Sequence, residues 1–222
     1  MKNARAFRAW GSLCGVLYVV LFVVGSILMF DGPSGDESPA KYIAFYGDNG
    51  NRDKINIGWL LMGLGLFFFV WFVAALREKV RDVEYRDGGR DGIMGSLVTI
   101  GGTAYAAVAM AATGLSAGVR TMSDDTYNHE VFPGIIHAAN DGVYIMHVTG
   151  TAALAAMIFA ISLVTFASGV LPRWLGWFGV LAGVAALASI IFFTMFIWLL
   201  WIAVLSVVLF LQARKPAATA TA

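Results

Sequence analysis

Long apolar stretches separated by short polar segments dominate the pattern of this chain. A helix needs about 20 mostly apolar residues to cross ~30 Å of hydrocarbon, because every backbone N–H and C=O must be bonded within the segment. The last apolar run, 174–212, would be roughly 58 Å long as one helix, so we expect two crossings joined by a turn near Thr194. The pattern predicts an all-α polytopic membrane bundle that forms a single domain. Its six expected transmembrane helices are 9–30, 55–76, 93–118, 134–168, 174–193 and 195–212.

Basic residues are divided unevenly between the two sides of this predicted bundle. With six crossings, eleven Lys and Arg lie on the side of the two termini and four lie on the other side. Cytoplasmic loops carry an excess of Lys and Arg, so both termini are predicted to be cytoplasmic in a multi-pass protein of the cell (inner or plasma) membrane. The eleven are Lys2, Arg5, Arg8, Arg77, Lys79, Arg81, Arg86, Arg90, Arg173, Arg214 and Lys215, and the four are Lys41, Arg52, Lys54 and Arg120.

The outer loop 31–54 is long enough to contain structure of its own. Ser38-Pro39 resembles an N-cap followed by the first helical position, which predicts a short interfacial helix after it. The residues that would then lie on the outer membrane surface are Tyr42, Ile43, Phe45 and Tyr46.

The two other long connections differ in character. The cytoplasmic loop 78–92 alternates positive and negative charges, as solvated segments do. The outer loop 119–133 carries His129, and all three histidines of the chain lie between residues 129 and 147. This clustering is the main chemical signal of the sequence.

Composition and charge exclude several classes of protein. Apolar residues make up 59% of the chain and charged residues only 13%, which is typical of membrane proteins rather than of soluble domains. The net charge of +1 gives no basic excess, so nucleic-acid binding is excluded as a main role and the lipid bilayer is the expected partner. Cys14 is the only cysteine, and alone it forms neither an intrachain disulfide nor a cysteine-based zinc or iron–sulfur site.

A polar face on the expected helix 134–168 is the strongest candidate site. At 100° per residue, its polar side chains fall within a sector roughly 120° wide. Such a face must point into the bundle or a water-filled cavity, because exposing it to acyl chains costs several kcal/mol. We therefore predict an outward-facing ligand pocket lined by this fourth helix, with Arg120 as a neighbour. The residues of the face are His137, Asn140, Asp141, Tyr144, His147 and Thr151.

Small residues predict that the third and fourth helices pack closely. Glycine and alanine let helix backbones approach each other in a membrane. The third helix contains Gly101, Gly102 and the pair Gly114-x-x-x-Gly118, and the fourth contains Gly150. We expect a tight hairpin of these two helices.

Several functions remain open for the polar face. In one, its side chains satisfy one another and fix the helix register. In another, they bind a small polar ligand or a lipid headgroup. These functions suit a non-enzymatic protein, including an accessory subunit of a membrane complex or a homo-oligomer. A third possibility, a small oligomeric transporter, would need a polar path from the pocket to the cytoplasm.

The enzymatic alternative is a metal-dependent membrane enzyme. His137 and Asp141 have the i, i+4 spacing that can chelate one divalent ion, and His129 would be a third ligand. His147 lies ~15 Å farther along the helix than His137, so it joins the same ion only if the helix is kinked. No complete catalytic constellation is present, and no cofactor is predicted beyond this possible divalent metal.

Two interfacial motifs resemble a known family. One is the run Leu171-Pro172-Arg173-Trp174-Leu175-Gly176-Trp177 with Gly183 soon after, and the other is the end of the second helix, Trp71-Phe72-Val73-Ala74-Ala75-Leu76-Arg77. Together they resemble an uncharacterised family of bacterial six-helix membrane proteins, catalogued as a domain of unknown function. The resemblance implies an integral inner-membrane protein and brings no assigned activity or catalytic residues.

Overall fold

A computed structural model describes residues 2–29, 32–33, 37–86, 92–121 and 131–214, and all regular secondary structure within them is helical. A short helix, α2, lies between the first two long ones, and a 3₁₀ turn, η2, joins the last two. The elements are α1 Lys2–Met29, α2 Pro39–Gly47, α3 Asn49–Arg86, α4 Ile93–Thr121, α5 Pro133–Ser168, α6 Arg173–Leu187, η2 Phe192–Thr194 and α7 Met195–Arg214.

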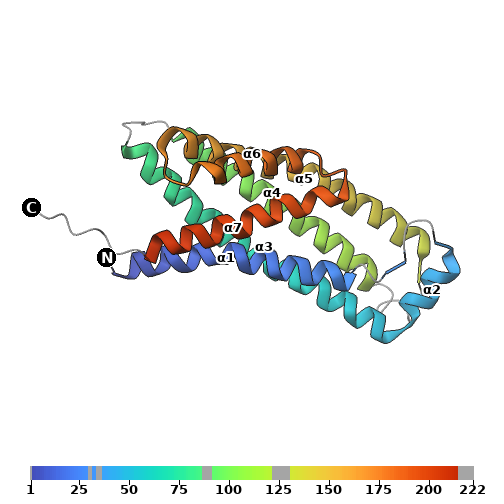
Figure 1. The fold of residues 1–222 in the computed structure, drawn as a ribbon. Coiled ribbons are helices and arrows are strands. Elements are labelled where there is room, and N and C mark those ends of the chain that lie inside the picture. Colours follow the sequence, from blue (N-terminus) through green and yellow to red (C-terminus); the bar gives the residue numbers. More distant parts are fainter. Residues whose placement is uncertain (1, 30–31, 34–36, 87–91, 122–130, 215–222) are drawn as a thin grey trace, which may run out of the picture.

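The long helices and α6 form a closed ring (Figure 1). Each packs on the next in chain order, from α1 to α3, α4, α5, α6 and α7, and α7 packs back on α1. Successive members run in opposite directions, so α1 begins and α7 ends at the same end of the bundle. We call this the termini end and the opposite one the α2 end.

Five of these helices, α1, α3, α4, α5 and α7, are long and apolar enough to cross a membrane. The sixth member of the ring, α6, has 15 residues and is a shorter apolar helix. The chain is therefore a multi-pass helical membrane protein by length and composition, whereas the sixth crossing and the cytoplasmic placement of the termini stay predictions.

Aromatic side chains fill the centre of the ring. Tyr18 of α1, Phe69 of α3, Tyr105 of α4 and Trp198 of α7 are all fully buried. The two tyrosine hydroxyls are 2.7 Å apart and hydrogen-bonded to each other, which satisfies polar groups far from water. The first and last helices of the ring, α1 and α7, thus share one core with α3 and α4.

Glycines allow the closest helix contacts. A Cβ atom on Gly101 of α4 would lie 2.5 Å from the carbonyl oxygen of Ala153 in α5, so only hydrogen fits there. The crossing of α1 and α3 is similar, because a Cβ on Gly25 would lie 2.6 Å from the carbonyl oxygen of Gly58. Gly114 has no neighbour within 4 Å of such a Cβ, so it lies outside the α4–α5 contact.

Helix α3 is longer at both ends than the expected helix 55–76. At its start, the Asp48 carboxylate accepts a hydrogen bond of 3.0 Å from the backbone N–H of Asn51, which caps the first turn. At its end, the charged residues expected in the loop 78–92 continue the helix as far as Arg86. Polar residues can extend a helix into water because a helix satisfies its own backbone wherever it lies.

The turn between α6 and α7 has no glycine or proline to mark it. Helix α6 ends at Leu187 rather than at 193, and η2 ends at Thr194. The Thr194 hydroxyl donates hydrogen bonds to the carbonyl oxygens of Ala188 at 3.2 Å and Ile191 at 2.7 Å. The same two carbonyls accept backbone hydrogen bonds from the N–H groups of Ile191 at 2.9 Å and Thr194 at 3.0 Å, so backbone and side-chain bonds hold the turn together.

Helix α2 follows Ser38, as the sequence predicts, but its aromatic residues do not lie on a membrane surface. Tyr42 and Tyr46 are buried and pack with Ile55 of α3 and Ile136 of α5. The physical reason is that contacts with α3 and α5 remove the two tyrosine rings from water, as contact with lipid would also do.

Candidate functional site

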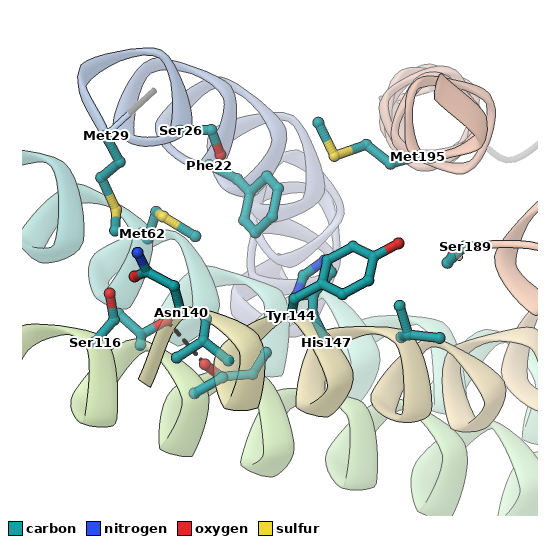
Figure 2. A pocket seen from close by; sticks show the side chains of 15 residues that line it. Phe22, Ser26, Met29, Met62, Ser116, Asn140, Tyr144, His147, Ser189 and Met195 are labelled. Carbon is teal, nitrogen blue, oxygen red and sulfur yellow. Dashed lines mark hydrogen bonds between the residues drawn. The ribbon is translucent and has the colours of Figure 1, made fainter. Parts of the chain in front are cut away.

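A cavity of about 230 Å³ lies inside the ring, on the side of the α2 end (Figure 2). It is bounded by α1, α3, α4, α5, the start of the α6–α7 connection and the start of α7. Its lining residues are Phe22, Ser26, Met29, Met62, Ala109, Ala112, Thr113, Ser116, Asn140, Val143, Tyr144, His147, Val148, Ser189 and Met195. None of these side chains carries a permanent charge, and most of them are apolar.

His147 lies at the inner end of the cavity. Its ring is stacked on Phe22 with centroids 5.8 Å apart, and it contacts the edge of Tyr105 at 6.2 Å and Trp198 at 6.4 Å. Among the described residues, no hydrogen-bond partner reaches its imidazole nitrogens. An imidazole that faces a cavity without a partner can accept or donate a hydrogen bond to a bound molecule.

Behind His147, outside the lining of the cavity, lies a second group with unused hydrogen-bonding capacity. Trp198 is fully buried, and its indole N–H has no partner in the described part of the chain. An unpaired buried donor costs about 1–3 kcal/mol. Unpaired buried groups of this kind are rare in folded proteins, and this one lies in the aromatic core against His147.

Tyr144 closes one side of the cavity. Its hydroxyl donates a hydrogen bond of 2.5 Å to the carbonyl oxygen of Ile190, in the connection between α6 and α7. Tyr144 and Ile190 are both exposed in the isolated chain, so this wall is thin and faces the surroundings of the bundle. In Figure 2 the Tyr144 ring lies across the cavity in front of His147.

The structure divides the predicted polar face of α5 between different surroundings. Asn140, Tyr144 and His147 line the cavity. His137 instead packs against Tyr42 of α2, with ring centroids 4.3 Å apart, and Asp141 is exposed.

One further member of the predicted set does not line the cavity, and two fall outside the description. Thr151 is fully buried and donates a 2.7 Å hydrogen bond to the carbonyl oxygen of Val148 within α5. Nothing is described of the Arg120 side chain, and His129 lies outside the described residues.

The metal alternative depends on one of these undescribed residues. Among the residues that the structure does describe, no group of three or more His, Cys, Asp and Glu side chains could hold a metal ion. His137 and Asp141 are the two candidate ligands that the structure describes, and the third in the hypothesis is His129. The metal site therefore stays a prediction from the sequence.

Much of the cavity wall was not predicted from the sequence. Met29, Met62 and Met195 come from three different helices, and Phe22 and Ser26 come from α1. Methionine and phenylalanine in an apolar helix do not differ in pattern from residues that face lipid. Ser26 is the exception, because a hydroxyl within an apolar helix indicates a face that points inward.

The fold and the cavity together define a class, a multi-pass helical membrane protein with a small uncharged cavity within its helix ring. Comparisons of the chain with protein-family models, with curated proteins and with solved structures find no match. The resemblance to a bacterial six-helix family therefore stays a prediction from the two interfacial motifs.

Proposed function

We propose that this protein binds a small, uncharged, mostly apolar ring compound that carries one or two hydrogen-bonding groups. The observation that carries the proposal is the cavity itself, with an uncharged lining and a His147 imidazole that lacks a partner among the described residues. The ligand's ring would occupy the apolar part, and its polar group would bond to His147.

The size of the cavity limits the size of the ligand. Its 230 Å³ lies between the ~150 Å³ of a cavity that binds benzene and the ~300 Å³ at which drug-sized pockets begin. A compound of one or two fused rings suits this volume. A whole lipid would not fit, although part of one would.

The lining favours a planar ring over a charged group. Phe22 offers a stacking face, and the thioethers of Met29, Met62 and Met195 are flexible, polarizable groups that make favourable contacts with aromatic rings. A charged ligand would lose its hydration without gaining an opposite charge in this lining. The proposal thus narrows the polar-ligand hypothesis and disfavours a charged lipid headgroup in this cavity.

The packing inside the helix ring favours ligand binding over transport across the bundle. Beyond His147, toward the termini end, α5 continues with Leu154, Ile158 and Ile161, which are buried in the hydrophobic core. Transport would require these side chains to move apart. The packed core supports a pocket closed at its inner end.

We also propose that the six members of the helix ring each cross the membrane, with the cavity in the outer half of the bundle. The eleven basic residues assigned to the termini end support this orientation. Since the Tyr144 wall is thin and exposed, a membrane-soluble ligand would enter there from the outer leaflet.

Equilibrium dialysis of the detergent-purified full-length protein tests the ligand class with three matched probes. They are naphthalene, 1-naphthol and the anion 1-naphthoate, each measured against protein-free micelles to remove detergent partitioning. We expect 1-naphthol to bind about fivefold more tightly than naphthalene, the value of one hydrogen bond. Naphthoate should bind at least tenfold more weakly than naphthol. If each of the three probes partitions equally into micelles with and without the protein, the proposal is refuted.

Replacement of His147 by leucine should remove the preference for the hydroxyl. Leucine keeps an apolar side chain at the inner end of the cavity but offers no hydrogen bond, so we expect naphthol and naphthalene to bind with similar affinity. The same dialysis measures this ratio. His137→Leu is the matched control, because His137 lies against Tyr42 outside the cavity, and its ratio should stay at about five.

Replacement of Tyr144 by phenylalanine should speed the exchange of ligand. The change removes only the hydroxyl that bonds to Ile190, which costs about 1 kcal/mol. If the whole of this energy lowers the barrier to ligand release, the release rate rises about fivefold. Stopped-flow release of 1-naphthol measures this rate. Tyr85→Phe at the termini end is the control, and equal release rates in the two variants would contradict the role of Tyr144.

A further inference from the structure

A second cavity, of about 310 Å³, lies at the termini end between the last turns of α3 and the first turn of α4. Unlike the cavity in the ring, it is lined by charged and polar groups. The residues that matter below are Arg77, Arg81, Glu84, Tyr85, Gly95 and Ser96.

Glu84 holds the two helices together at this cavity. Its carboxylate accepts hydrogen bonds from the backbone N–H of Met94 at 2.9 Å and of Gly95 at 3.3 Å. A Cβ on Gly95 would lie 3.1 Å from the same carboxylate, so glycine makes room for it. The negative charge of Glu84 is thus directed to the positive end of the α4 dipole.

The guanidinium groups are the charges that remain available. Arg77 and Arg81 are one turn apart on α3, and both are exposed. Arg77 has no ion pair or hydrogen bond with any described residue. Arg81 donates a 3.2 Å hydrogen bond to the Tyr85 hydroxyl and lies 5.1 Å from the centre of that ring, which restricts its position.

This arrangement suits a tetrahedral anion. Guanidinium groups present planar pairs of donors that match the oxygens of a phosphate. Ser96, on the α4 side of the cavity, adds a hydroxyl donor. Among the described residues of the lining, two cationic side chains accompany a single carboxylate that already accepts hydrogen bonds, so this part of the cavity has a positive balance.

The cavity also lies at the depth of lipid headgroups. The apolar part of α3 ends at Leu76, and the first charged residue after it is Arg77. Trp174 and Trp177 at the start of α6 are exposed at the same end of the bundle, as expected of side chains at a membrane–water interface.

We infer that this cavity binds the phosphate group of an anionic lipid headgroup, with Arg77 and Arg81 as the main ligands and Ser96 as an additional donor. Free phosphate shares the same chemistry and is the other possible source of the group. Basic pockets between membrane helices on the cytoplasmic side recognise lipid phosphates in this way. The inference does not depend on the proposed ring compound, which occupies a separate cavity.

Native mass spectrometry of the full-length protein in detergent tests this inference. Phosphatidylglycerol is compared with diacylglycerol of the same acyl chains, which lacks the phosphate, and inorganic phosphate is added as a competitor. We expect phosphatidylglycerol to bind at least tenfold more tightly than diacylglycerol. Displacement of the lipid only by far higher phosphate concentrations identifies a lipid site, whereas tight binding of phosphate without lipid binding identifies a free-phosphate site.

Variants then locate the site. Arg77→Gln and Arg81→Gln should each weaken phosphatidylglycerol binding about tenfold, and Arg214→Gln should not, because Arg214 lies at the same end but outside the cavity. If the unmodified protein binds phosphatidylglycerol and diacylglycerol with equal affinity and does not bind phosphate, the inference is overturned. An equal loss in the Arg214 variant would also overturn it, because that result indicates a general charge effect.

Discussion

Replacement of Gly101 by alanine is expected to lower the melting temperature of the detergent-solubilised protein by about 2–12 °C. The added Cβ would lie 2.5 Å from the backbone oxygen of Ala153 and 3.0 Å from the backbone nitrogen of Met157. Backbone atoms of a helix do not yield as a flexible side chain does, so α4 and α5 must separate. Overpacking of this kind costs about 1–3 kcal/mol, and each 1 kcal/mol lowers the melting temperature by about 2–4 °C in proteins of this size.

Gly114→Ala is the matched control for this experiment. Gly114 lies on the same helix, but a Cβ there would meet no atom within 4 Å. Alanine also has a higher helix propensity than glycine, so the control should melt at the original temperature or slightly above it. Thermal unfolding followed by circular dichroism measures both variants. Equal melting temperatures in the two variants would contradict the close contact of α4 with α5.

Replacement of Ala112 by tryptophan is expected to abolish ligand binding while the fold is retained. Ala112 lines the cavity and is only 3% exposed. An indole is close in size to 1-naphthol, so it would occupy the space that the ligand's ring needs. Burial of about 150 Å² of ring surface is worth about 4 kcal/mol, and its loss weakens binding on the order of several hundred-fold.

Ala111→Trp provides the control for the filled cavity. Ala111 is the neighbouring residue on α4 and is exposed, so the same indole there would point away from the cavity. We expect this variant to bind 1-naphthol like the original protein in equilibrium dialysis. Undiminished binding in the Ala112 variant, with an unchanged circular dichroism spectrum, would place the ligand elsewhere.

The sequence predicts the helices well because their main determinant is local. A long apolar run needs no partner to be recognised, and five such helices are present. The end of α6 at Leu187 could not be predicted in the same way. Side-chain bonds such as those of Thr194 produce that turn, and the apolar residues around it give no contrast.

The candidate site could be predicted only in part, for a related reason. Helical periodicity places His137 and His147 on one broad face, but it does not show that α2 covers the first of them. Periodicity also does not separate Gly101, which lies against α5, from Gly114, where an added Cβ would meet no described atom of another helix within 4 Å. These differences depend on where neighbouring helices end and cross, which is a property of the assembled bundle.

The closure of the ring through α1 and α7 bears on how the protein is made. Phe22 of the first helix and Met195 of the last lie on the same cavity, and Phe22 packs against Trp198 with ring centroids 6.3 Å apart. Helices enter a membrane in the order of their synthesis, so α1 must wait there until α7 arrives. Until then its inward face is covered by lipid or by other proteins, and the side of the cavity that α7 lines is missing. The cavity is therefore complete only when the last helix has joined the ring, and a chain that stops before α7 lacks Met195 from its wall.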